Sequence, residues 1–330
     1  MPTVLCLGVP ANATVGIDLA CWQVGPKFQG ICQVPTGPHY IYTGGDGVHG
    51  MRTGQFVVLE PDGSDVWVGR WDPVTEQLVV LSDEDEYNRY ADGVRRHDFD
   101  LGLGPYPFES FDDWRSLTNF ISNDVLKKLS PVGNGVISGS QAPGAECNVE
   151  TTRIYFTDLE SFTPRRPMAP HELTRAYLDR SDQLEAIAGN DWDAILGELQ
   201  YAFVLFVIGQ SFEGFEQWKR LLSLVCTCPR AMTDHRPFYG NFINVLCSQM
   251  KQAPDDFFAC DLTRHNFLTR CLSDLFELGE DTPLRPALHR LRALVSSKFG
   301  WHLTGAPVLN AQGTFNSDDE DAPAIVDLQE

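Results

Sequence analysis

The chain has 330 residues, 43% of them hydrophobic and 21% charged, a composition typical of globular proteins. Its 45 acidic side chains outnumber its 25 basic ones, giving a formal net charge of −20. This excess argues against a sequence-tolerant nucleic-acid binder, whose affinity rests on Lys and Arg replacing phosphate counterions, and against docking on anionic lipid. A basic protein partner suits the charge better. The length fits two domains of ordinary size.

Nine cysteines are present and none forms a C-x-x-C pair, so the sequence predicts free thiols in a reducing compartment. The opening residues MPTVLCLGVP lack the basic region of a secretory signal. The longest apolar run, Ala202–Gly209, is far shorter than the ~20 residues that cross a bilayer. We therefore expect a soluble intracellular protein with no membrane association.

Short runs rich in Val, Ile, Tyr and Trp, separated by turn residues, dominate the chain up to about residue 81. Pro61–Gly63 predicts a hairpin joining Phe56–Leu59 to Val66–Val68, because Gly63 supplies the positive φ of a tight reversal. Together the runs predict an antiparallel β unit. The expected strands are Thr3–Val9, Gly30–Val34, His39–Tyr42, Gln55–Glu60, Val66–Trp71 and Gln77–Leu81.

The periodicity changes after Ser82. A capping hydroxyl followed by acids in Ser82–Asp85 is typical of a helix start. The prolines of Leu103–Pro107 exclude a continuous helix there. Next comes an apolar stripe at helical spacing that we expect to close the open face of the β unit. The stripe consists of Phe111, Trp114, Leu117, Phe120 and Ile121.

The domain boundaries follow from composition. Residues 1–132 form the predicted β-rich domain, and 133–170 form a linker with turn composition and a short strand at Arg153–Phe156. Residues 171–303 form the predicted helical domain. Its helices are expected at about His171–Ile187 before Gly189, from the cap Asp191 to Ile208, from the cap Ser211 to Val225, at Phe238–Met250, and from Thr282–Pro283 to Phe299, with a less regular helical stretch at 255–278. The helix after Asp191 is apolar almost all round, so we expect it at the centre.

Residues 304–330 form a predicted flexible, acidic tail. The acidic run consists of Asp318, Asp319, Glu320 and Asp321, and the β-prone run consists of Ala324, Ile325, Val326, Asp327 and Leu328. An isolated strand is not stable in water, so the second run needs a partner. The predicted fold class is α+β and multidomain: an antiparallel β-rich N-terminal domain with short helices, an all-α C-terminal domain and this tail.

Patterns that carry chemistry are weak. Thr43–Gly47 is rich in glycine but lacks the P-loop lysine, and a hairpin loop explains it better than a phosphate site. No two histidines stand at i, i+4, and the acidic run at 318–321 lacks the glycine and the twelfth-position Glu of a calcium loop. Cys147 with a distant histidine stays open as a nucleophile. We therefore predict no catalytic, cofactor-binding or metal-binding residue and no enzyme.

Four blocks resemble the AAR2 family of splicing factors. The blocks are Gly16-Ile17-Asp18 with Trp22–Gly30, Val34-Pro35 and His39; Leu103–Pro107 with Trp114 and Ser116–Ile121; Leu196–Val204 continuing through Phe215–Leu222; and Ala322–Leu328. The resemblance spans both predicted domains and the tail. Compared with animal members, Leu129–Arg153 is short, which puts regulation by modification of that stretch in doubt, although Ser138 and Ser140 remain.

The resemblance implies a non-catalytic assembly chaperone of the U5 small nuclear ribonucleoprotein in pre-mRNA splicing. Such a protein binds the RNase H-like domain of the large spliceosomal scaffold protein (the pre-mRNA-processing-eight type) and holds off helicase and RNA until maturation. Its tail is expected to add a strand to that domain and to bridge it to the Jab1/MPN-like domain. The resemblance also implies location in cytoplasm and nucleus; we further expect a monomer that contacts no nucleic acid.

Two alternatives stay open at this point: a cytosolic adaptor for another basic protein, and a Cys-dependent hydrolase built on Cys147. For the side chains of the folded domains, the sequence favours Trp22, Phe28 and Trp114 as core residues rather than interface residues.

Overall fold

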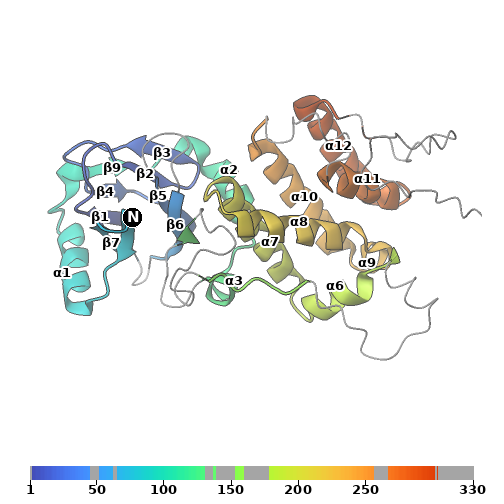
Figure 1. The fold of residues 1–330 in the computed structure, drawn as a ribbon, viewed down its shortest axis with the longest axis horizontal. Coiled ribbons are helices and arrows are strands. Elements are labelled where there is room, and N and C mark those ends of the chain that lie inside the picture. Colours follow the sequence, from blue (N-terminus) through green and yellow to red (C-terminus); the bar gives the residue numbers. More distant parts are fainter. Residues whose placement is uncertain are drawn as a thin grey trace, which may run out of the picture.

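The computed structural model describes residues 2–44, 52–61, 65–130, 137–138, 153–159, 178–255, 267–301 and 303. A lobe of β-sheets with short helices is followed by a lobe of helices, as the sequence predicted. In Figure 1 the β lobe lies on the left and the helical lobe on the right, with α2, α3 and α7 between them.

The first sheet has five strands in the order β8-β7-β1-β4-β9. Two of its pairings, β1 with β7 and β4 with β9, are parallel, so the expectation of a wholly antiparallel unit was wrong for this sheet. A parallel neighbour needs a long crossover, and here the chain between β1 and β7 passes through the second sheet. The strands are β1 (Thr3–Leu7), β4 (Gly30–Cys32), β7 (Val66–Asp72), β8 (Gln77–Val80) and β9 (Leu103–Pro105).

The second sheet is antiparallel, in the order β10-β6-β5-β2-β3. Its strands are β2 (Thr14–Ile17), β3 (Ala20–Gln23), β5 (Gly37–Gly44), β6 (Arg52–Leu59) and β10 (Ile137–Ser138). β5 and β6 pair as antiparallel neighbours up to Gly44 and Arg52, as a hairpin requires, while Gly45–Gly47 of the predicted loop lie outside the described residues. The predicted hairpin across Pro61–Gly63 was wrong: β6 pairs with β5 and β10, whereas β7 pairs with β1 and β8. Between Leu59 and Val66 the chain passes from the second sheet to the first.

Helix α1 (Glu84–Arg95) covers the first sheet, where Ala91 packs with Leu5, Val66 and Val68. Its N-cap is Asp83 rather than Ser82: Oδ1 of Asp83 accepts from the backbone N of Glu86 at 2.7 Å. A 3₁₀ turn at Asp100–Gly102 precedes β9, and another at Phe108–Ser110 precedes α2.

Helices α2 (Phe111–Thr118) and α3 (Asn123–Leu129) close the second sheet. Trp114 is 1% exposed, packs with Tyr40 and Tyr42, and donates from Nε1 to the carbonyl of Pro38 at 2.9 Å. The predicted role of the apolar stripe is confirmed for Trp114 and Ile121, which lie in this cluster, but the helix ends at Thr118, before Phe120 and Ile121. Leu117 on the same helix belongs to the core of the helical lobe, so α2 contacts both lobes.

The helical lobe consists of α6 (Ser181–Ala188), α7 (Trp192–Val207), α8 (Phe212–Cys226), α9 (Pro229–Asp234), α10 (Arg236–Gln252), α11 (Phe267–Gly279) and α12 (Arg285–Phe299). Asp191 and Ser211 cap α7 and α8, as predicted. The last helix begins at Arg285, with Pro286 rather than Pro283 in its first turn. The short helix α9 was not predicted. In the described part of the chain, no helix is both long and apolar enough to span a bilayer.

Helix α7 is the central element, as its sequence predicted. Its residues from Ile195 to Leu205 are buried, and it contacts α2, α3, α6, α8 and α10. Tyr201, Val204 and Leu205 on one side pack with the second sheet, whereas Leu196, Leu199 and Phe203 pack within the helical lobe. One buried helix thus belongs to both cores.

Residues 153–159, the described part of the segment before α6, form no strand, and the short strand of the predicted linker is β10 instead. The backbone N of Tyr155 donates to the carbonyl of Leu129 at 2.9 Å, which fixes the segment beside the end of α3. The division at 133–170 itself stays a prediction.

Candidate functional site

The residues that the sequence singles out for partner binding all belong to the tail. The acidic run Asp318–Asp321 and the β-prone run Ala324–Leu328 lie outside the described residues, so their role stays a prediction. Cys147, the candidate nucleophile, also lies outside them. The polar groups that the fold buries and exposes elsewhere provide the remaining candidates.

A buried histidine–carboxylate pair links three parts of the β lobe. Asp18 is 0% exposed and His39 is 1% exposed, and Nδ1 of His39 lies 2.7 Å from Oδ2 of Asp18. Nε2 of His39 lies 2.9 Å from the carbonyl of Pro35, and the hydroxyl of Tyr106 donates to Oδ2 of Asp18 at 2.6 Å. Oδ1 of Asp18 accepts from the backbone N of Tyr40 at 2.9 Å.

This pair lacks the geometry of a catalytic relay. Both ring nitrogens of His39 already face acceptors, so neither is left to take a proton from a nucleophile. Asp18 sits at a turn with φ of 56°, and its carboxylate joins that turn to β5 and to the segment after β9. Asp18, His39 and Tyr106 belong to the first two blocks of the family resemblance, and their role here is to fix the β lobe.

Two buried thiols, Cys6 and Cys228, are unsuited to nucleophilic chemistry. Burial raises the pKa of Cys6 to about 12 and, with help from the charge of Asp179, that of Cys228 to about 12. Both therefore stay protonated near neutral pH and pack as small apolar groups. Among the residues that the structure describes, no three or more His, Cys, Asp or Glu side chains are grouped to hold a metal ion.

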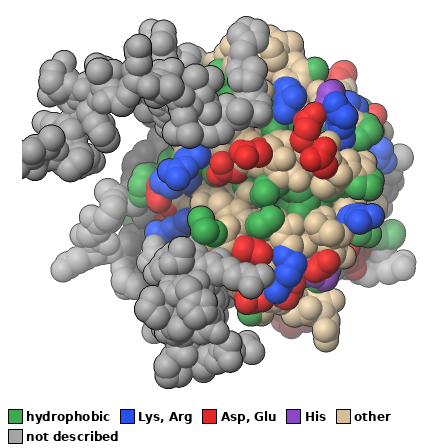
Figure 2. Space-filling view, turned by 90° about the vertical axis from the view of Figure 1, so that its right-hand side faces the viewer, with side chains coloured by type: hydrophobic (Ala, Val, Ile, Leu, Met, Phe, Trp, Pro, Cys, Tyr) green, Lys and Arg blue, Asp and Glu red, His purple; other side chains and the backbone are tan. Residues whose placement is uncertain are grey.

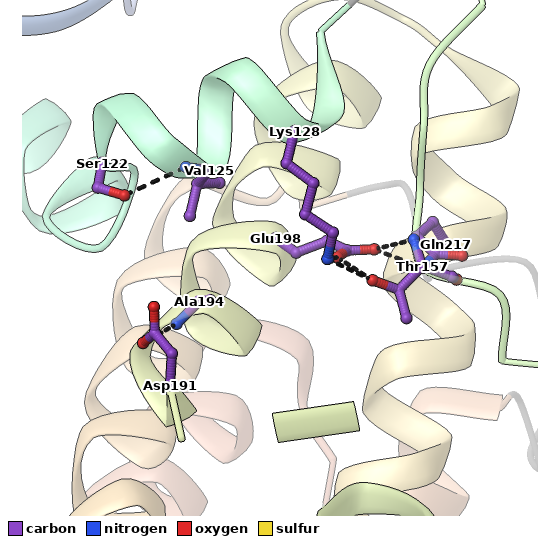
Figure 3. A network of polar contacts seen from close by, with 8 residues as sticks. All are labelled: Ser122, Val125, Lys128, Thr157, Asp191, Ala194, Glu198 and Gln217. Atoms are coloured by element: carbon purple, nitrogen blue, oxygen red, sulfur yellow. Dashed lines mark hydrogen bonds and ion pairs between the residues drawn. The ribbon is translucent and has the colours of Figure 1, made fainter. Parts of the chain in front are cut away.

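A buried carboxylate with several polar partners lies in the helical lobe. We call it the Glu198 cluster: Glu198 with Lys128, Thr157 and Gln217 (Figure 3). Glu198 lies in the middle of α7 and is 3% exposed. Its Oε1 accepts from the backbone N of Thr157 and from Nε2 of Gln217, both at 2.8 Å, and its Oε2 accepts from the Thr157 hydroxyl at 2.6 Å. Nζ of Lys128 lies 3.4 Å from Oε2.

The Glu198 cluster explains why a carboxylate is tolerated in a buried helix. Three hydrogen bonds and a partly exposed ammonium compensate for its lost hydration. They join residues 153–159 to α3, α7 and α8 (Figure 3). Because every acceptor direction is occupied, Glu198 has no free position for general acid–base chemistry. Its function is to fix the segment that connects the lobes.

A second cluster, centred on Gln200, lies a half-turn further along α7. Nε2 of Gln200 donates to Oδ1 of Asn119 at 2.7 Å and to the carbonyl of Ser116 at 3.2 Å. Its Oε1 accepts from the backbone N of Phe120 at 2.8 Å. The block Ser116–Ile121 and the block Leu196–Val204, eighty residues apart in the chain, are therefore direct neighbours in the fold.

Sequence reasoning did not single out Glu198 or Gln200 as individual residues. The available signal was the presence of two polar side chains in a helix that is otherwise apolar on almost all sides. Such residues are buried only with partners, but their partners, Thr157 and the end of α2, lie too far away in the chain to be identified from local pattern.

The outer surface of the helical lobe carries both charge signs. Figure 2 shows acidic and basic side chains interspersed around hydrophobic ones on the face turned to the viewer, with no continuous basic band across it. In the β lobe, Trp114 is buried as expected and Phe28 is half-buried. The expectation that Trp22 is a core residue was wrong: it is 40% exposed on β3, an edge strand of the second sheet.

A mixed β lobe fastened through buried polar clusters to a bundle of helices defines a two-lobed α+β protein. The family model of the AAR2 N-terminal domain matches residues 1–131, and that of the AAR2 C-terminal repeat region matches residues 156–304. The chain belongs to the AAR2 family.

Curated relatives cover almost the whole chain. The AAR2 homologues of Mus musculus and Homo sapiens are each 32% identical, over 99% of this chain and 94% of their own length. The A1 cistron-splicing factor AAR2 of Saccharomyces cerevisiae is 22% identical, over 91% of this chain and 88% of its own length.

Proposed function

We propose that this protein is a splicing factor that acts as a non-catalytic assembly chaperone of the U5 small nuclear ribonucleoprotein. In this proposal it binds the RNase H-like domain of the large spliceosomal scaffold protein and keeps helicase and RNA away until the particle matures. The observation that carries the proposal is the family match, which covers both lobes and extends to a relative named as a splicing factor.

The fold supports a role in binding rather than in chemistry. The buried polar groups of the described residues, His39 with Asp18 and the Glu198 and Gln200 clusters, are used up in holding the fold. Two lobes fixed in this way present a pre-organised surface, and such a surface loses little entropy on binding a folded partner.

The tail adds a second mode of contact in this proposal. Alternation along a strand turns Ala324, Val326 and Leu328 to one side, and Ile325 and Asp327 to the other. Backbone hydrogen bonds to a sheet edge of the partner give affinity, and the alternate side chains give specificity. Residues 305–321 span up to ~56 Å at ~3.3 Å per residue, which is enough to cross a partner domain and to reach the adjacent Jab1/MPN-like domain.

The test is a pull-down and a binding titration of the full chain with the scaffold's RNase H-like domain, with and without residues 305–330. We expect full-length protein to bind and the truncated chain to bind ~10- to 100-fold more weakly, since one donated strand contributes a few kcal/mol net. Val326→Asp should reproduce most of the loss, whereas Asp327→Asn, on the other face, should not.

Absence of binding by the full chain overturns the proposal. Affinity purification that recovers another basic protein and no spliceosomal component favours the adaptor alternative. A hydrolytic activity that disappears in Cys147→Ser favours the enzyme alternative. Evidence that residues 324–328 pack against the protein's own lobes overturns strand donation by the tail.

The same proposal includes a monomer in cytoplasm and nucleus that enters the nucleus with its partner. Size-exclusion chromatography with light scattering tests the first part. Imaging of the tagged protein before and after depletion of the scaffold tests the second.

A further inference from the structure

A cavity of about 850 Å³ opens between α8 and α11 on the helical lobe. Residues of α8, α11, Leu159 and the start of α6 line it, and neither the β lobe nor the polar clusters described above contribute to it. Its lining includes Phe267 and Cys271 together with charged side chains.

The described lining residues are mostly basic in a strongly acidic protein. Arg180, Lys219, Arg220 and Arg270 line the cavity, against one carboxylate among the described lining residues, Asp274. Four of the 25 basic residues of the whole chain therefore meet at one opening. Burial raises the pKa of Asp274 above its usual value, so the site disfavours the charge of the single opposing carboxylate.

Three of the four basic residues, Arg180, Lys219 and Arg220, have partners within the fold. Nζ of Lys219 contacts Oε1 of Glu216 at 2.6 Å, and Nε of Arg180 donates to Oε1 of Gln183 at 2.9 Å. No hydrogen bond or ion pair joins Arg270 to any other described residue, although it lies on the exposed side of α11 beside Asp274. Like charges gathered around a cavity repel one another, and an anionic ligand removes that repulsion.

The chain contains an acidic segment that can reach this cavity. Four consecutive carboxylates, Asp318–Asp321, begin fifteen residues after Leu303, which packs at the end of the helical lobe. Fifteen residues extend to ~50 Å and have a typical end-to-end distance of ~20 Å as a flexible chain. A lobe of this size has a radius of gyration of about 14 Å, so an extended tail reaches most of its surface.

We infer that the cavity between α8 and α11 is a binding site for an acidic peptide, and that its occupant in the isolated protein is the chain's own Asp318–Asp321 run. Tethering raises the local concentration of the run to the millimolar range, so individually weak contacts are enough. Docking through these carboxylates leaves the β-prone run Ala324–Leu328 free for a partner. A more basic partner surface then competes for the acidic run and releases the tail.

The test is carbodiimide cross-linking of the full-length protein alone, mapped by mass spectrometry. The reagent joins an ammonium to a carboxylate only when they touch, so we expect Lys219 to cross-link to a carboxylate within 318–321. Exposed Lys127 on α3 serves as an internal reference and should give at least ~5-fold less product with the same peptide. Raising NaCl to 0.5 M should lower the Lys219 product by a similar factor, because salt screens exposed ion pairs.

Two matched charge reversals distinguish binding in this cavity from attraction of the tail to any basic residue. Arg270→Glu should lower the Lys219 product at least ~5-fold, whereas Arg290→Glu, at an exposed position on α12 outside the cavity, should leave it unchanged. Circular dichroism checks that both variants fold. Equal yields in wild type and Arg270→Glu overturn the inference, and so does a Lys127 product as abundant as the Lys219 product.

A mixture of ¹⁴N- and ¹⁵N-labelled protein distinguishes the occupant. Cross-links within one isotope confirm docking of the chain's own tail, whereas mixed-isotope cross-links overturn it in favour of a second copy. The cross-linking experiment contains no scaffold domain, so a negative result there leaves the proposed function intact. A negative pull-down in turn leaves this inference intact.

Discussion

Glu198 illustrates how a single buried carboxylate stabilises a connection between distant segments. Replacing it with alanine leaves the backbone N of Thr157 without its acceptor and removes one of the two bonds that Nε2 of Gln217 donates, in a site that is nearly closed to water. We expect Glu198→Ala to lower the free energy of unfolding by about 2–4 kcal/mol, since each buried donor left unpaired costs about 1–3 kcal/mol. Glu198→Gln should lose less, because its amide oxygen still accepts one bond.

Urea denaturation of the three proteins measures this difference. The matched control is Glu277→Ala on α11, an exposed position where we expect a change below ~0.5 kcal/mol. A stability of Glu198→Ala within that margin would contradict the assigned role of the cluster.

The thiols provide a second prediction at the scale of the residue. Cys21 is exposed on β3, whereas Cys6 is 1% exposed and burial raises its pKa to about 12. Because burial disfavours the thiolate, roughly one Cys6 thiol in ten thousand is ionised at pH 8. In thiol titration of the folded protein, Cys21→Ser should remove one fast-reacting group and Cys6→Ser should remove none. A loss of one fast group in Cys6→Ser would show that this burial is wrong.

At the scale of the element, two glycines in helices should respond in opposite ways to alanine. A Cβ on Gly197 of α7 would lie 2.4 Å from the carbonyl oxygen of Phe120 and 2.9 Å from Cγ2 of Val125. A Cβ on Gly240 of α10 would meet nothing closer than Cδ2 of Leu284 at 4.0 Å. Alanine favours a helix over glycine by about 1 kcal/mol, so the neighbours decide the sign at each site.

We therefore expect Gly240→Ala to stabilise the protein by about 0.5–1 kcal/mol, and Gly197→Ala to destabilise it by about 1–3 kcal/mol through overpacking. Thermal denaturation of the two variants against wild type gives both signs. If both substitutions stabilise the protein, the close approach of α7 to the turn between α2 and α3 is not real.

The same elements show what the sequence does and does not determine. Helices α7 and α8 were predicted with their caps, because Asp191 and Ser211 act on amides three residues away. β2 and β3 were missed, since each has only four residues, β2 mostly buried and β3 mostly exposed, so neither shows alternation. The parallel pairing of β1 with β7 depends on residues about sixty positions apart, and the contacts of Glu198 with Thr157 and of Gln200 with Asn119 span 41 and 81 positions. The tail was found from composition and resemblance, and its role rests on a partner that the chain alone does not contain.

At the scale of the whole molecule, the two lobes share a core. Phe56 of the second sheet stacks on Tyr201 of α7 with ring centroids 4.8 Å apart, and Tyr40 and Trp114 lie in the same buried cluster. Nη1 of Arg52 on β6 donates to the carbonyl of Ile208, just after α7, at 2.9 Å. Separating the lobes would expose this cluster to water, so neither lobe is expected to unfold while the other stays intact.

A core substitution confined to the helical lobe therefore tests whether the molecule unfolds as one unit. Phe242 on α10 is 0% exposed and packs only within the core of the helical lobe, so Phe242→Ala should cost about 3–5 kcal/mol. If unfolding is cooperative, the slowest-exchanging amides of β5 in the other lobe exchange through the same global unfolding. Their free energy of opening then falls by the same amount, and their exchange becomes at least ~100-fold faster. Native-state hydrogen exchange measures both lobes at once, and Val74→Ala, at an 89% exposed position, serves as the control. Faster exchange in α10 with unchanged exchange in β5 would mean two independent domains, in which the shared α7 transmits no stability between them.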